Sequence, residues 1–177
     1  LDILHSLNEL SRNIRAEKPE LYQIQKELSE IDGRKVYPFA VQCAAFALIA
    51  GAFTIFFGGN FIDAAAAAVI GAVLKVVVYI ADKSAVNMVF ANVVSSFILC
   101  SLAFLCVFIG FGEHVDMIII GNIMLLIPGI GLTNSIRDIV SGDIMAGMLR
   151  FCESVIIAVA IAAGYILSAL LLGGLIR

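Results

Sequence analysis

Apolar residues occur in long runs over most of the chain, and short polar turns separate these runs. A bilayer core of about 30 Å is crossed by about 20 helical residues, and four runs reach that length. They cover residues 38–57, 61–81, 86–111 and 151–176. A further run, 115–127, is shorter because Pro128-Gly129-Ile130-Gly131 follows it. The pattern predicts an all-α, polytopic integral membrane protein with about five transmembrane helices, the fourth of them broken.

The first 35 residues follow a different pattern, in which apolar residues recur every three or four positions between charged ones, as in amphipathic helices. Pro19 lacks a backbone donor and disfavours helix at Lys18, so we expect two helices, about 1–16 and 19–31. A coiled-coil or hairpin contact and a solvated linker both fit this segment. We expect a cytoplasmic helical segment over 1–35, with further chain upstream of it, and a transmembrane domain over 36–177. The apolar positions are Leu7, Leu10, Ile14, Leu21, Ile24, Leu28 and Ile31.

Composition excludes a soluble globular domain. The 177-residue chain is 62% hydrophobic and 14% charged, with a mean hydropathy of +1.06, whereas soluble domains are roughly 45–50% apolar and about 25% charged. The net charge of -3 gives no indication of a nucleic-acid partner. The four cysteines lie in apolar runs without metal-ligand spacing, and no Ser-His-Asp, HExxH or P-loop pattern occurs. We therefore expect neither an enzyme nor a bound metal or cofactor.

Basic residues are unevenly distributed among the loops. Nine of the 11 Lys and Arg residues lie within 1–35, 82–85 or 132–150, and the loops at 58–60 and 112–114 contain none. Basic loops remain in the cytoplasm, so the N-terminus is expected to be cytoplasmic.

Small residues recur at four-residue spacing along the spans, which allows helix backbones to approach closely in lipid. A solute path lined by small residues is the alternative interpretation. The glycines expected to serve helix packing or hinges are Gly51, Gly71, Gly131, Gly142, Gly147 and Gly164.

Two polar residues inside the spans are candidates for binding. Asp63 lies within the first turn of the second span, where it either faces protein or water to bind an ion, or complements the helix dipole. Asn122 lies inside the fourth run and either coordinates a solute or forms an interhelical hydrogen bond. His114, in an outer loop, is either a proton sensor or a solvated residue.

The break in the fourth span carries the strongest functional signal. Broken helices occur in membranes where freed backbone groups line a cavity, and in secondary transporters such breaks mark the substrate site. After Pro128 and Gly129, an amphipathic stretch places Asn134 and Asp138 four residues apart, with Arg137 beside them. We interpret these five residues as candidates for substrate or coupling-ion binding. The alternative is an ordinary cytoplasmic helix that lies on the headgroups.

The string Pro128-Gly129-x-x-Leu132-x-Asn134-x-x-x-Asp138-x-x-x-Gly142-x-x-x-x-Gly147 resembles the signature of the ThrE-type threonine/serine exporter family, N-terminal membrane module. Phe57-Gly58-Gly59 followed by Asp63-Ala64 is a second, shorter match, and the resemblance covers about residues 25–177. It implies export of small amino acids or small organic acids across the prokaryotic inner membrane, driven by protons or the membrane potential. It also implies a second membrane module, fused or present as a separate subunit.

Pattern and resemblance together suggest a transport hypothesis. Arg137 would attract a substrate carboxylate at a cytoplasm-facing vestibule, and Asp138 or Asp63 would bind an ammonium group or a coupling proton. The expected partners are membrane lipid, a small solute and the second module, and a homo-oligomer also fits. A non-transporting scaffold or accessory subunit and an oligomeric pore are the alternatives.

Overall fold

The computed structural model describes residues 12, 22, 24, 37–84 and 86–176, and the chain divides into two units, Leu1–Pro38 and Phe39–Arg177. Positions 12, 22 and 24 are helical. The remainder of the two helices expected over 1–16 and 19–31 lies outside the described residues. The helical segment over 1–35 and its separation from 36–177 therefore stay predictions.

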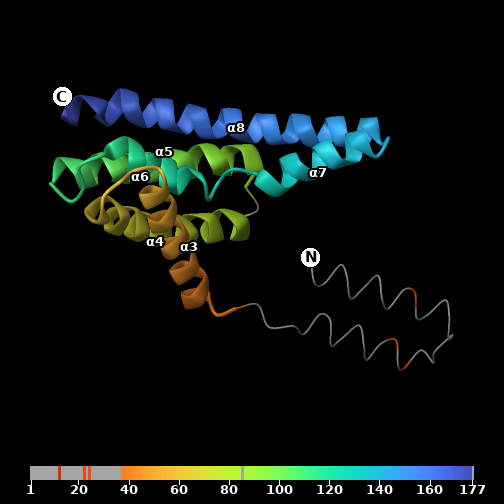
Figure 1. Ribbon diagram of the computed structural model, residues 1–177, viewed down its shortest axis with the longest axis horizontal. Helices are drawn as coiled ribbons and strands as arrows, with labels where there is room; N and C mark the ends of the chain where they lie inside the picture. The colour runs from red at the N-terminus through yellow and green to blue at the C-terminus, as the bar shows by residue number, and fades with distance from the viewer. Residues whose placement is uncertain (1–11, 13–21, 23, 25–36, 85, 177) are drawn as a thin grey trace. The chain divides into compact units, whose positions relative to one another are not determined.

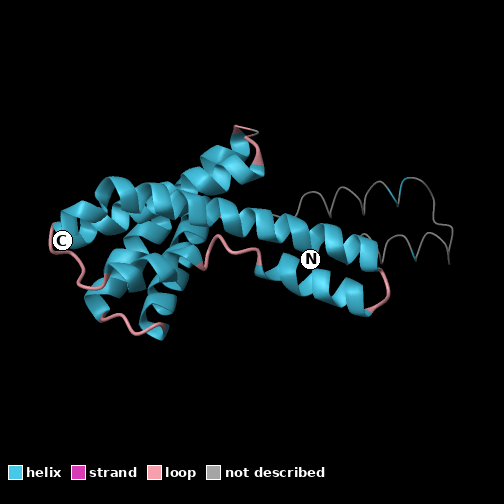
Figure 2. Cartoon of the chain, turned by 90° about the horizontal axis from the view of Figure 1, so that it is seen from above, coloured by secondary structure: helices cyan, strands magenta, loops and turns pink. Residues whose placement is uncertain are grey.

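The described part of the second unit consists of helices and their connecting turns, with no strand among its residues (Figures 1 and 2). Helices α3, α4, α5 and α8 are long and apolar enough to cross a membrane, by length and composition. This confirms the predicted all-α, polytopic membrane fold, and the shorter α6 and α7 occupy the place of the expected fourth span. The elements are α3 (Phe39–Phe56), α4 (Phe61–Lys83), α5 (Met88–Phe108), α6 (Val115–Ile123), α7 (Gly129–Val140), α8 (Ile144–Leu172) and the 3₁₀ helix η1 (Gly173–Ile176).

The segment expected to form the fourth span is interrupted, but the interruption begins earlier than the sequence suggested. Helix α6 ends at Ile123, and turns over 124–127 separate it from α7. Pro128 caps α7, where its missing N–H removes no helical hydrogen bond. Gly129 and Gly131 therefore lie in the first turn of α7 and not in the interruption. The nine residues of α6 rise only about 14 Å, so α6 alone is too short to cross a bilayer.

Helices α5 and α8 run side by side in the same direction. The Ser96 hydroxyl donates to the Ile161 carbonyl at 2.7 Å, and the Ser101 and Ser168 hydroxyls lie 3.1 Å apart. In this register α8 begins more than two turns before α5, whose first residue is Met88. The N-terminal turns of α8 extend past α5 and pair with α7 as a helical hairpin (Figure 1).

Small residues bring α3 and α4 into close contact. A Cβ on Gly71 would lie 2.8 Å from both the Ala50 Cβ and the Phe46 carbonyl oxygen, and a Cβ on Gly51 would lie 3.1 Å from the Ala64 carbonyl oxygen. Only glycine permits this approach without a shift of the neighbouring helix.

Helix α6 packs against α3 through a contact that the sequence interpretation missed. A Cβ on Gly121 would overlap the Thr54 hydroxyl, which donates to the Ala50 carbonyl at 2.9 Å. The short helix is thereby held in the bundle. The buried apolar core consists of Ala50, Ala66, Ala67, Ile70, Leu74, Leu99, Cys100, Ala103, Phe104, Ile118 and Ile119.

Candidate functional site

A cleft of about 340 Å³ lies where the α7–α8 hairpin leaves the bundle, beside the interruption. Its volume falls in the range of about 300–1,000 Å³ that is usual for small-molecule sites. The start of α5, the first turns of α7 and the middle of α8 form its walls. The lining residues are Met88, Pro128, Ile130, Gly131, Asn134, Arg150, Glu153, Ser154 and Ile157. We refer to this site as the hairpin cleft.

An ion pair across the hairpin places one cation in this cleft. The Arg150 Nη1 group, on α8, donates to Asp138 Oδ2, on α7, at 2.7 Å. The Arg150 side chain is 56% exposed and the Asp138 side chain 28%, so solvent reaches the pair. Because a guanidinium carries five N–H donors, Arg150 retains donors for a further acceptor.

Only part of the polar row predicted on α7 contributes to the cleft. Asn134 lines it, as do Pro128 and the Gly131 backbone. Arg137 is exposed and lies outside the lining, so among the described residues Arg150 is the cation that lines this cleft. Glu153 lies three residues after Arg150 on the same helix, but the ion pair that Arg150 forms is with Asp138.

Glu153 remains a carboxylate without a counterion in the described part of the chain. It lies three residues after Arg150 on α8, is exposed, and lines the same cleft. The next residue, Ser154, donates its hydroxyl to the Arg150 carbonyl at 3.0 Å. A Cβ on Gly131 would lie 3.1 Å from the Ser154 hydroxyl oxygen, so a larger residue there would crowd the cleft wall.

The local sequence accounts for the hairpin. Gly142 has φ +94°, a left-handed conformation that glycine adopts at little cost, and it ends α7. The Asp143 carboxylate then accepts from the Ala146 N–H at 3.3 Å and caps α8. A Cβ on Gly147 would lie 2.7 Å from the Ser135 carbonyl oxygen, so the two helices are in close contact. This contact fixes Arg150 opposite Asp138.

A second cleft, of about 410 Å³, lies between the end of α4, the start of α5 and the turn at Leu125 and Leu126. Asp82, Asn92 and Ser95 supply its polar lining, and Met88 belongs to both clefts. The interruption of the fourth span is thus flanked by two hollows at the same end of the bundle.

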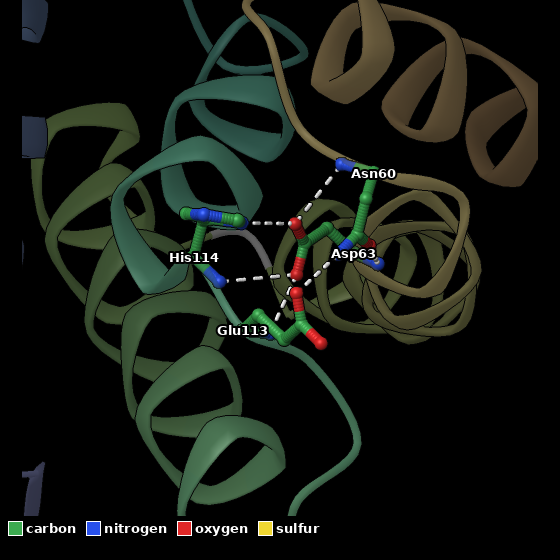
Figure 3. A network of polar contacts seen from close by, with 4 residues as sticks. All are labelled: Asn60, Asp63, Glu113 and His114. Carbon is green, nitrogen blue, oxygen red and sulfur yellow. Dashed lines mark hydrogen bonds and ion pairs between the residues drawn. The ribbon is translucent and has the colours of Figure 1, made fainter.

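Asp63 forms a dense hydrogen-bond network at the opposite end of α4 (Figure 3). Its side chain is fully buried. The Oδ1 atom accepts from the Glu113 N–H at 2.7 Å and from the His114 N–H at 3.1 Å. The Oδ2 atom accepts from the Asn60 N–H at 3.1 Å and lies 2.8 Å from His114 Nδ1. With four neighbours, this carboxylate has no free position for a substrate group.

The network joins the start of α4 to the loop between α5 and α6. Asn60 Oδ1 accepts from the Asp63 N–H at 2.8 Å, which completes a capping box at the first turn of α4. His114 lies in a loop outside the long apolar helices, and its pKa is raised from the ordinary value of 6.5, chiefly by its hydrogen bond to Asp63. The geometry favours an anchoring role for Asp63. Its carboxylate complements the dipole of α4, as one interpretation of the sequence proposed, and it also bonds to a loop that lies 50 residues away in the chain.

The amides inside the apolar helices bond within their own helices. The Asn122 Nδ2 group donates to the Ile118 carbonyl at 3.0 Å, and the Asn92 Nδ2 group donates to the Met88 carbonyl at 2.8 Å. Asn122 is fully buried, and its Oδ1 atom has no hydrogen-bond partner among the described residues. An interhelical hydrogen bond, one of the two roles considered for Asn122, is therefore absent among the described residues.

A family model matches the chain across residues 1–173. It is ThrE, described as "Putative threonine/serine exporter". No curated protein and no solved structure matches the chain. The matched region contains the four long apolar helices, the interrupted fourth span and both ends of the bundle at which polar residues gather.

Proposed function

Because the chain belongs to the ThrE family of threonine/serine exporters, we propose that it is a transporter, or a transporter subunit, that exports small amino acids across the prokaryotic inner membrane. Export is coupled to the proton motive force and uses a second membrane module. The observation that carries this proposal is the hairpin cleft beside the interrupted span, with an arginine in its wall.

The cleft supports transport because of where it lies. An interrupted helix exposes backbone groups that a continuous helix would satisfy internally, and such groups persist in membranes only beside protein or a polar cavity. Transporters use this arrangement to bind solutes. Here the interruption adjoins two clefts that contain a cation, carboxylates, amides and hydroxyl groups. A purely anchoring bundle has no need of them.

In the proposed orientation the hairpin cleft faces the cytoplasm. Ser84, Arg137 and Arg150 then lie on the basic, inner side, and the Asp63 network lies on the outer side. Substrate reaches the cleft from the cytoplasm, as export requires.

Single-cysteine labelling tests this orientation. In intact cells, an impermeant thiol reagent should label Phe61→Cys and leave Ser84→Cys unlabelled, because we expect these exposed positions to lie on opposite sides of the membrane. Both should react after permeabilisation, which controls for access. Labelling of position 84 alone in intact cells would show that the orientation is the opposite of the one proposed. The background protein lacks Cys43, Cys100, Cys106 and Cys152.

Threonine efflux tests the function itself. Cells that express this chain together with a second module should lose preloaded threonine faster than control cells, and Arg150→Gln should slow this efflux by about tenfold or more. Losing hydrogen bonds to a charged group costs about 1.5–3 kcal/mol, and about 1.4 kcal/mol corresponds to tenfold. Lys83→Gln removes an exposed cation that lines neither cleft and should change efflux less than twofold.

The amount of each variant in the membrane is measured in parallel, so that lost expression is not read as lost transport. Normal efflux by Arg150→Gln at a normal membrane level would show that the hairpin cleft does not lie on the transport path. No threonine efflux by the unmodified protein with its module would favour a scaffold or accessory role.

A further inference from the structure

We propose that Arg150 and Glu153 bind the two charged groups of an α-amino acid zwitterion, and that together they select zwitterions over organic dianions. This assignment rests on the proposed function. The proposed function already names small amino acids as the substrates; the assignment adds the residues that hold the two charged groups and the physical reason why an organic dianion binds less well.

The spacing of the two residues suits this ligand. Residues three apart on a helix lie on neighbouring turns of one face, with about 5–6 Å between their Cβ atoms. Arg150 and Glu153 hold this relation on α8, and both line the hairpin cleft. The ammonium and carboxylate groups of an α-amino acid are attached to the same carbon atom, so a single small molecule can contact both side chains.

Each side chain has free capacity for its partner. Arg150 donates one Nη1–H to Asp138, and its other donors can hold a substrate carboxylate in the bidentate manner typical of arginine. Glu153 forms no ion pair or hydrogen bond with any described residue, and as an ionised carboxylate it accepts from an ammonium group. Asp138 acts as a positioning residue, because it holds the guanidinium at the cleft.

The charges in and around the cleft disfavour a dianion. Arg150 contributes one positive charge, and Asp138 and Glu153 contribute one negative charge each. A monocarboxylate with an ammonium group satisfies Arg150 and Glu153 together. The second carboxylate of a dicarboxylic acid would face Glu153 as a like charge, which costs free energy.

The remaining lining suits a small side chain with a hydroxyl group. Asn134 lines the cleft and forms no hydrogen bond with a described residue, so its amide can bond to a substrate hydroxyl. Ile130 and Ile157 provide apolar surface for a methyl group. Gly131 keeps the wall open, since a side chain there would meet Ser154.

The assignment is tested by calorimetry, which measures the equilibrium binding of each probe to the purified protein in lipid nanodiscs. The probes are L-threonine, threoninol without the carboxylate, β-hydroxybutyrate without the ammonium, and succinate as the dianion. The unmodified protein should bind threonine most tightly. Glu153→Gln should weaken threonine binding about tenfold and leave β-hydroxybutyrate binding unchanged. Arg150→Gln should weaken the binding of threonine and of β-hydroxybutyrate and leave threoninol binding unchanged.

Matched variants separate binding from folding. Asp116→Asn removes an exposed carboxylate from the first turn of α6, far from the cleft in the fold, and should leave threonine binding unchanged. Glu153→Asp and Arg150→Lys keep the charges and should retain binding weaker than the unmodified protein but stronger than the neutral variants.

Three results would overturn the assignment. They are unchanged threonine binding by Glu153→Gln, succinate binding tighter than threonine binding, and no threonine binding by the unmodified protein. In each case threonine efflux from cells remains a separate measurement, so the assignment can fail while the exporter function stands.

Discussion

Asp63→Ala should destabilise the protein by about 3 kcal/mol or more, because it removes the acceptor of three backbone N–H groups. The donors are those of Asn60, Glu113 and His114. A buried donor that loses its partner costs about 1–3 kcal/mol, and water that enters from the exposed loop recovers part of this cost. The free energy of unfolding, measured by SDS titration in mixed micelles, should fall accordingly, and the loop between α5 and α6 should become sensitive to protease.

Asp63→Asn provides the matched comparison. It retains one side-chain oxygen for the Glu113 and His114 N–H groups but places an amide N–H₂ toward Asn60, so an intermediate loss is expected. Asp116→Asn, an exposed carboxylate, should change stability by less than about 0.5 kcal/mol. Asp63→Ala with unchanged stability and lost proton coupling of efflux would contradict the anchoring role and restore the coupling-ion role expected from sequence.

Gly164→Ala should destabilise the α5–α8 contact by about 3 kcal/mol, the upper end of the usual cost of overpacking. A Cβ at this position would overlap the Val93 carbonyl oxygen and would lie 2.8 Å from both the Phe97 nitrogen and the Ser96 Cβ. Two of these neighbours are backbone atoms, so no side-chain rotation relieves the clash. The helices must separate, which also stretches the hydrogen bond from Ser96 to the Ile161 carbonyl.

Gly173→Ala is the control for this substitution. Its Cβ would have no neighbour within 4 Å, and its φ of -62° suits any residue. Alanine favours helix over glycine by about 0.8–1 kcal/mol, so this variant should be neutral or slightly more stable. The midpoint temperature of thermal unfolding in detergent, monitored by size-exclusion chromatography, distinguishes the two. Equal midpoints for both variants would show that α5 and α8 can separate at little cost.

The candidate site was predictable in part. The spacing of Asn134 and Asp138 indicated a polar face after a helix break, and both residues lie at the hairpin. The sequence pointed to Arg137, the nearest arginine in the chain, which is exposed and does not line the hairpin cleft. The cation that bonds to Asp138 is Arg150, which lies twelve residues away across a reversal of the chain. Gly142 followed by Asp143 was the available signal, since a left-handed glycine before a helix cap predicts a hairpin that brings such residues together.

The sequence showed that Asp63 is unusual but did not identify the residues that bond to it. A carboxylate at the start of an apolar helix is a local feature, and Asn60 three residues earlier predicts a capping box. The donors from Glu113 and His114 come from a loop about 50 residues away. No local pattern in the sequence identifies that loop, so the carboxylate could be interpreted equally well as a binding group.

The sequence by itself determined the all-helical membrane fold, the approximate limits of the apolar helices and the existence of a break near Pro128. Transfer of a helix into lipid depends on the hydrophobicity summed along the segment, and proline acts on its own turn, so both effects are local in the chain. Only the tertiary structure decided which side chains meet. The pairing of Asp138 with Arg150, the position of Glu153 in the cleft without a counterion among the described residues, and the four contacts of Asp63 depend on helix register and on turns that reverse the chain. Register in lipid is set by close contacts of small residues such as Gly164 and Gly121, and these contacts are defined only when two helices are placed together.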